Sequence, residues 1–261
     1  MKNGRMAWTV FLFLTLCLVS CTAHLEGQKK QGEALKEIGK QYFLKGDYAS
    51  ALKNLLESEK LYSNDPYLQD YIGLTYMEKN KPDLAINHFK QALAIKPDYT
   101  PAMNNMGTVY MKKKEWDAAI ACFQKTTGDL LYVTPQNPLF NLGWSYYNKK
   151  EYNLSEEYYR KALLYYRDGF PKDAVYTKSL DGLALVYIAM GKGLKAVETL
   201  EKAIKHSPRF ARLYFDLAKA HALLHNYKKA LYSYNKVVEL APESPLADEA
   251  KKEAEAILNL R

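Results

Sequence analysis

Cysteine is scarce in this chain of 261 residues, with three copies at Cys17, Cys21 and Cys122. Cys17 lies in an N-terminal segment that we predict to be removed, and Cys21 is a predicted lipidation site. One remaining thiol forms no internal disulfide, which excludes a crosslinked small-domain scaffold. Cys122 precedes Phe123 on a predicted helix, so we interpret it as a small buried hydrophobe rather than a nucleophile.

Long hydrophobic runs are also missing. The longest apolar stretch runs from Met6 to Val19, 14 residues, whereas a membrane-spanning helix needs ~20. Lys2 and Arg5 precede this stretch, so residues 1–20 are typical of an export signal. The stretch ends in Leu-Val-Ser before Cys21, which resembles a bacterial lipobox. A plain cleavage site or an uncleaved anchor would need no cysteine there.

The lipobox resemblance implies that Cys21 carries a lipid anchor. Two or more acyl chains, at ~0.8 kcal/mol per buried methylene, hold a protein stably at a membrane. Residues 21–31 would then form a lipidated polar tether. Thr22 stands where an aspartate would retain the lipoprotein in the inner membrane. By the sorting rule of this class, the expected location is the inner leaflet of the outer membrane, facing the periplasm.

The chain has no block of five basic residues. Its formal net charge of +8 falls to +6 when Lys2 and Arg5 are cleaved off with the signal. Lysine and arginine alternate with glutamate and aspartate, which is typical of solvated helix faces. Nucleic acid is therefore not an expected partner.

Catalytic motifs are missing as well. The sequence has no glycine-rich phosphate loop and no serine nucleophile elbow. His221 and His225 stand four apart on a predicted helix, but no glutamate lies between them and no third ligand is indicated. We interpret His221 as a packing residue, and we expect no enzyme activity, cofactor, metal or small-molecule substrate.

What the chain does have is an internal repeat. Six blocks align without gaps over 34 residues: 32–65, 66–99, 100–133, 136–169, 177–210 and 211–244. The eighth position is always small: Gly39, Gly73, Gly107, Gly143, Ala184 and Ala218. The eleventh is tyrosine in five of the six: Tyr42, Tyr76, Tyr110, Tyr146 and Tyr187. This period and pattern resemble the tetratricopeptide repeat (TPR).

Each block then predicts a helical hairpin whose two helices approach closely at the small positions. Pro97, Pro208 and Pro242 mark the ends of second helices, because proline donates no backbone hydrogen bond. One hairpin cannot bury its apolar face alone, so the fold class is all-α, a right-handed superhelix of six hairpins. Residues 245–261 predict a C-terminal capping helix.

Binding in a TPR array is expected on the inner face, which the first helix of each hairpin lines. The residues that the resemblance places there are Tyr67, Leu74, Met77, Asn104, Asn105, Thr108, Met111, Phe140, Asn141, Trp144 and Tyr147. The amides of Asn105 and Asn141 could hold the main chain of a protein segment, with aromatic residues taking its side chains. The alternative is that Trp144 and the tyrosines only pack against adjacent helices.

One joint breaks the regular pattern, between the third and fourth blocks. Gly128 is expected to end a helix early, because glycine accepts the left-handed conformation of a helix end. The displaced apolar residues are Leu130, Leu131, Tyr132 and Val133. They either plug the gap between two hairpins or present an apolar surface to a partner.

Three segments carry a more specific resemblance: Asn104-Asn105-Met106-Gly107, Asp129-Leu130-Leu131-Tyr132 with Pro135, and Asn141-Leu142-Gly143. Together with the lipobox, they resemble the type IV pilus pilotins (the PilF, PilW and Tgl group). That family implies an outer-membrane lipoprotein scaffold that binds the pilus secretin and promotes its localisation and multimerisation. The alternative is a general periplasmic adaptor that recruits cell-wall enzymes or proteases.

Overall fold

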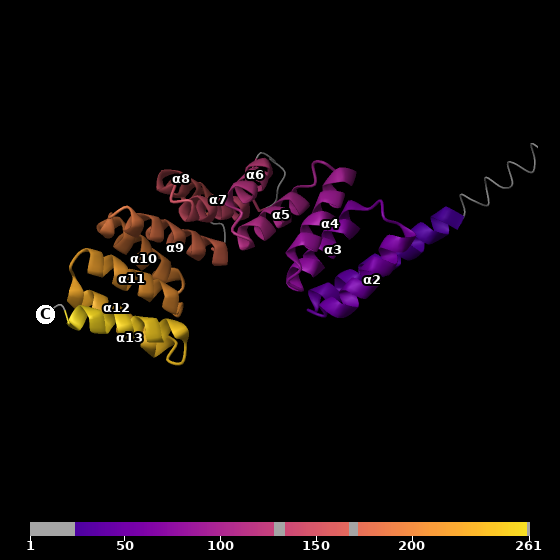
Figure 1. Cartoon of the computed structure of the whole chain (residues 1–261). Helices are drawn as coiled ribbons and strands as arrows, with labels where there is room; N and C mark the ends of the chain where they lie inside the picture. Colours follow the sequence, from indigo (N-terminus) through magenta and orange to yellow (C-terminus); the bar gives the residue numbers. More distant parts are fainter. Residues whose placement is uncertain (1–23, 128–133, 167–171, 260–261) are drawn as a thin grey trace, which may run out of the picture. The chain divides into compact units, whose positions relative to one another are not determined.

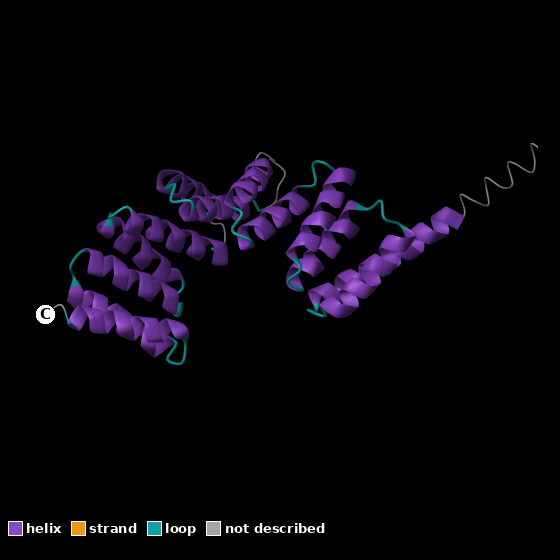
Figure 2. Cartoon of the chain, in the orientation of Figure 1, coloured by secondary structure: helices purple, strands orange, loops and turns teal. Residues whose placement is uncertain are grey.

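The computed structural model describes residues 24–127, 134–166 and 172–259. All regular secondary structure in these ranges is helical, and none of the described residues forms a strand (Figures 1 and 2). The predicted all-α fold of stacked helical hairpins is confirmed. The chain divides into two compact units, residues 1–109 and 110–261, with the division inside one helix.

The N-terminal unit starts with a helix over residues 24–44. Its further helices are α2 (Tyr48–Leu61), α3 (Pro66–Glu78), α4 (Pro82–Ile95) and the larger part of α5 (Thr100–Lys112). The C-terminal unit holds α6 (Trp116–Thr127), α7 (Gln136–Asn148), α8 (Tyr152–Leu164), α9 (Ala174–Ala189), α10 (Gly193–His206), α11 (Ala211–Leu223), α12 (Tyr227–Leu240) and α13 (Pro245–Leu258). In this unit α9 contacts both α7 and α11, so these three first helices form a continuous face.

The turn inside every hairpin has the same backbone conformation at the same repeat position. The fifteenth residue of each block has φ between 55° and 79°: Gly46, Asn80, Lys114, Lys150, Gly191 and His225. A left-handed residue ends a helix by satisfying its last carbonyl groups. Four of the six are not glycine, and each of these accepts a strain of about 1 kcal/mol. The position in the repeat, and not the type of residue, therefore determines the left-handed conformation of this turn.

Close helix contacts form at the eighth position, as predicted. A Cβ added to Gly73 would lie 2.6 Å from the ring of Phe89, and one added to Gly143 would lie 2.8 Å from the ring of Tyr159. The large partner is the twenty-fourth residue of the same block in both cases. A side chain at the glycine would separate the two helices, which explains why only small residues occupy this position.

The predicted polar tether needs a correction over residues 24–31. These residues are helical and continue without a break to residue 44. Lys30 pairs with Glu26 at 3.2 Å and Lys29 with Glu33 at 4.0 Å, both four residues apart on the helix surface. Such pairs support a helix that has no apolar face to bury. At ~1.5 Å per residue, this stretch reaches less than half as far as an extended tether.

Candidate functional site

The N-terminal unit contains six of the predicted binding residues, on α3 and α5: Tyr67, Leu74, Met77, Asn104, Asn105 and Thr108. The Asn105 amide makes one hydrogen bond to the preceding hairpin. Its Nδ2 donates a hydrogen bond to Asp70 Oδ1 at 2.9 Å. A buried carboxylate of the preceding hairpin thus takes one of the two N–H groups of the Asn105 amide, and the role of Asn105 in holding a bound segment stays a prediction. Asn104 Oδ1 is buried and has no partner among the described residues.

Asp70 is a residue that the sequence analysis missed. It is 5% exposed, and its Oδ2 also accepts from the Tyr99 hydroxyl at 3.4 Å. Burial raises the pKa of Asp70 to about 6, against the opposing effect of the hydrogen bonds from Asn105 and Tyr99. Asp70 is the fifth residue of its block, next to the position at which amides were sought. The repeat pattern could have placed it on the inner face.

Tyr67 gives the N-terminal unit an exposed aromatic surface. It is 47% exposed and meets Tyr99 edge to face, with ring centroids 5.1 Å apart. Lys96 Nζ lies 5.8 Å from the Tyr67 centroid and 5.6 Å from that of Tyr99. This arrangement suits apolar or weakly anionic groups of a partner.

The C-terminal unit contains the other five predicted binding residues: Met111, Phe140, Asn141, Trp144 and Tyr147. Trp144 stacks on Tyr147 with ring centroids 5.8 Å apart, and Phe140 meets the buried Tyr159 at 5.8 Å. The three aromatic residues pack against the main core cluster of this unit, yet all are only partly buried. They stabilise the fold with one side and keep surface for a partner on the other. Asn141 is half-buried, and its amide has no partner in the described part of the chain.

A charged cluster on α9 and α11 adjoins these aromatic residues. Arg212 Nε donates to Asp216 Oδ2 at 2.7 Å, and the Asp216 side chain is 0% exposed. Burial raises the pKa of both Asp216 and Asp181, that of Asp181 to about 7. The two carboxyl groups are close together, and like charges repel, so ionising both of them costs more than ionising one. Oδ1 of Asp181 and Oδ1 of Asp216 are both buried and accept no hydrogen bond from the described residues. One proton held between the two carboxyl groups would give both of these atoms a partner.

Tyr147 connects the cluster to α7. Burial raises the pKa of Tyr147, and the neighbouring Tyr152 and Asp216 raise it further. The face of α7, α9 and α11 thus combines partly exposed aromatic rings with a buried acid pair and one arginine. Asp181 occupies the fifth position of its block, as Asp70 does, and Asp216 occupies the adjacent sixth position. The sequence analysis sought amides there and overlooked carboxylates.

Two predicted features lie outside the described residues. The lipidation site Cys21 belongs to residues 1–23, and the joint residues Leu130, Leu131, Tyr132 and Val133 belong to residues 128–133. Both therefore stay predictions.

The histidine pair differs from expectation. His225 lies beyond the end of α11 with φ 58°, so it does not share a helix with His221. Cys122 is 6% exposed, and burial raises the pKa of its thiol to about 11. Within the described ranges, no three His, Cys, Asp or Glu side chains are grouped as metal ligands would be. No helix there has the length and apolarity needed to cross a bilayer.

Models of the tetratricopeptide repeat match residues 76–129, 137–168 and 182–245. The chain is a TPR protein. BBSome complex member BBS4 of Bos taurus is 26% identical over 212 residues, which cover 81% of this TPR protein and 39% of the relative. The chain thus spans about two fifths of that relative.

Two solved structures share the fold over nearly their whole length. Pseudomonas aeruginosa PilF superposes with a TM-score of 0.72 and 18% identity, covering 87% of this TPR protein and 99% of PilF. PilW, a widely conserved type IV pilus biogenesis factor, superposes with a TM-score of 0.75 and 20% identity, covering 84% and 97%. At these identities the likeness shows the fold alone.

Proposed function

We propose that this TPR protein is an outer-membrane pilotin that binds the type IV pilus secretin and promotes its localisation and multimerisation. The observation that carries the proposal is the partly exposed aromatic face of α7, where Trp144 and Tyr147 stack beside Arg212. Its support outside the site is the shared fold with PilW, a type IV pilus biogenesis factor, over 97% of PilW.

In this mechanism the α7–α9–α11 face holds a segment of a secretin subunit. Trp144 and Tyr147 take apolar side chains of the segment, since large rigid rings bury much area at low entropic cost. Asn141 is free to bond the segment's main chain, because its amide donates and accepts without an internal partner in the described chain. Arg212 gives the face a cation beside the rings.

The lipid anchor on Cys21 would confine this encounter to the membrane surface. Anchoring raises the effective concentration of the scaffold near its client without any additional contact. We expect Cys21→Ala to leave the protein unprocessed or released into the periplasm. Fractionation of envelopes with antibody detection measures this. Outer-membrane recovery equal to wild type would contradict lipidation at Cys21.

Replacing Trp144 by alanine is expected to reduce secretin multimers. Loss of a buried aromatic anchor costs ~2 kcal/mol in binding, about thirtyfold in affinity. Cells carrying the variant should accumulate monomeric secretin and assemble few surface pili. Detergent-resistant multimers on gels, together with pilus counts, give the readout.

Tyr232→Ala is the matched control, since Tyr232 is 68% exposed on α12, outside the proposed face. Because Trp144 also packs against the core, Asn141→Ala serves as a second variant, which removes the amide but no aromatic ring. Purified variants are first compared by thermal unfolding. Normal multimer levels with Trp144→Ala and Asn141→Ala would reject the proposal, and the general periplasmic adaptor would become the better hypothesis.

A further inference from the structure

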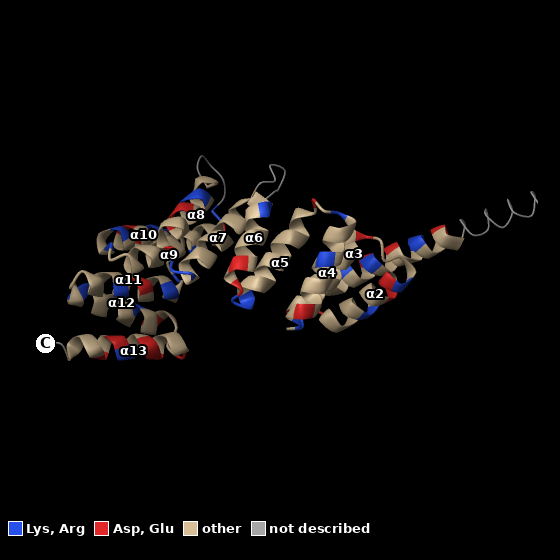
Figure 3. Cartoon of the chain, turned by 45° about the horizontal axis from the view of Figure 1, so that its top comes forward, with Lys and Arg blue, Asp and Glu red and all other residues tan. Residues whose placement is uncertain are grey.

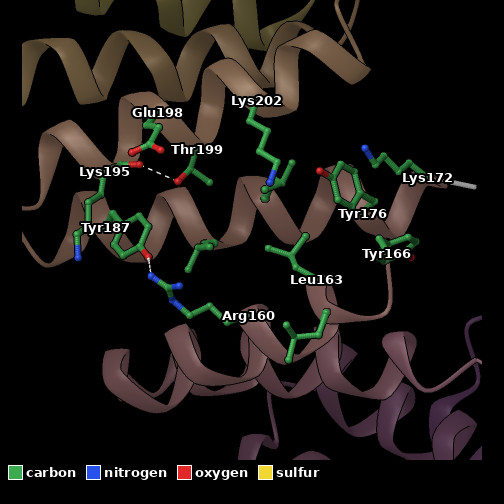
Figure 4. Close-up of a pocket in the computed structure, with 13 residues that line it drawn as sticks. Arg160, Leu163, Tyr166, Lys172, Tyr176, Tyr187, Lys195, Glu198, Thr199 and Lys202 are labelled. Carbon is green, nitrogen blue, oxygen red and sulfur yellow. Dashed lines mark hydrogen bonds between the residues drawn. The ribbon is translucent and has the colours of Figure 1, made fainter. Parts of the chain in front are cut away.

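A cavity lies between the second helices of two neighbouring hairpins in the C-terminal unit. α8 and α10 both pack on α9, but in the described chain their backbones do not come close to each other. The space left between them is about 470 Å³ (Figure 4). That volume is within the range of ligand-binding pockets, roughly 300–1,000 Å³.

The floor of the cavity is apolar. It consists of Leu163 from α8 with Leu180 and Leu183 from α9, the latter two only 2% and 5% exposed. Leu164 at the rim is 46% exposed. An aliphatic or aromatic side chain that rested here would cover the water-exposed surface of Leu163 and Leu164.

Three lysines surround this floor: Lys172, Lys195 and Lys202. Lys172 Nζ lies 5.2 Å from the ring centroid of Tyr176, and Lys195 Nζ lies 5.7 Å from that of Tyr187. Lys202 extends from α10 toward the cavity (Figure 4). Across the described residues, none of the three lysines forms an ion pair with a carboxylate.

Elsewhere in the C-terminal unit, acidic and basic residues occur together along the helices (Figure 3). Lys161 on the outer side of α8 pairs with Glu157 at 2.6 Å. Glu198 is the one carboxylate that lines the cavity, and its spacing from Lys202 would permit a pair that does not form. Such a concentration of unpaired positive charge favours an anionic partner.

Two further groups border this region. Arg160 is held by Glu156 at 3.0 Å and donates to the Tyr187 hydroxyl at 2.7 Å, so it closes one end of the cavity. Burial lowers the pKa of His206, and the positive charges of Lys172 and Lys202 lower it further.

We propose that the cavity between α8 and α10 binds an acidic segment of a partner protein. Carboxylates of that segment meet Lys172, Lys195 and Lys202, while one of its apolar side chains rests on the leucine floor. Charge complementarity selects the acidic segment, and the floor distinguishes it from a simple anion. This site is separate from the α7–α9–α11 face and does not depend on the secretin hypothesis.

The test uses the purified full chain and three fluorescein-labelled peptides in fluorescence anisotropy. The peptides are EELDLEE, EESDSEE with the same charge, and KKLKLKK with the opposite charge. We expect EELDLEE to bind at least about tenfold more tightly than either of the others. Lys195→Glu with Lys202→Glu should weaken its binding at least about tenfold.

Lys228→Glu with Lys229→Glu is the matched control, because it makes the same charge change at exposed positions on α12. An equal loss in both double variants would mean attraction by net charge only and would overturn the proposal. Leu164→Ser keeps every charge and should weaken EELDLEE but not EESDSEE. Equal affinities of these two peptides for wild type would show that the floor takes no part, which also overturns it.

The same experiments can also show that the cavity binds something other than an acidic protein segment. Phosphatidylglycerol vesicles that bind wild type but not the cavity variant, with no binding of EELDLEE, would assign the site to a lipid headgroup. A dimer that Lys195→Glu with Lys202→Glu converts to a monomer would assign it to a second copy of the chain. Both outcomes would reject an acidic partner segment.

Discussion

Gly182→Ala is expected to lower the free energy of unfolding of the C-terminal unit by about 3 kcal/mol, at the upper end of overpacking costs. A Cβ at this position would lie 2.3 Å from Cζ of Tyr159, whose side chain is 0% exposed. Gly143 lies against the same ring, with its added Cβ 2.8 Å away. The ring therefore has no space into which to move. A fall in melting temperature of roughly 6–12 °C follows for a unit of this size.

Differential scanning calorimetry with chemical denaturation measures this loss. Gly27→Ala is the matched control, since a Cβ there meets nothing within 4 Å, and it should leave stability unchanged or slightly raised. Tyr159→Leu replaces the ring by a shorter side chain, so in that background Gly182→Ala should lower the free energy of unfolding much less. Equal costs in both backgrounds would show that Tyr159 is not what the new methyl group meets.

Stability of the C-terminal unit is expected to fall as the pH rises from 4 to 8, and Asp181→Asn should remove most of that fall. In the folded protein, burial and the neighbouring Asp216 raise the pKa of Asp181 from its ordinary value of 3.8 to about 7. Between these pKa values the unfolded chain has released a proton that the folded chain still holds. Stability therefore decreases with pH in this window and levels off above pH 7.

The difference amounts to roughly 2–4 kcal/mol for the pair, taken from the shift in pKa. At pH 4 the variant and wild type should unfold alike, whereas at pH 8 the variant should be more stable. An asparagine amide can donate to Asp216 at every pH, in place of the shared proton. Asp248→Asn on α13 is the control, because its side chain is 76% exposed. Parallel pH profiles of wild type and Asp181→Asn would contradict a shared proton.

Sequence reasoning reached the fold but only part of the candidate site. The small residue at the eighth position and its large partner sixteen residues later, as in Gly73 and Phe89, belong to one hairpin. Contacts within one hairpin recur at the same positions of each block, so they can be predicted from the sequence. Asn105 and Asp70 are 35 residues apart, and which amide meets a buried carboxylate depends on how two hairpins stack.

The sequence by itself determined the all-helical TPR hairpins and their register. A 34-residue period with small residues at one position allows only one way of closing each hairpin, because backbone geometry and near-neighbour packing decide it. The tertiary structure decided the burial of Asp181 beside Asp216, the packing of Tyr159 between Gly143 and Gly182, and the cavity between α8 and α10. Each of these joins side chains from different hairpins. Their burial and charge exist only once the hairpins are stacked, since the same residues in an isolated hairpin would face water.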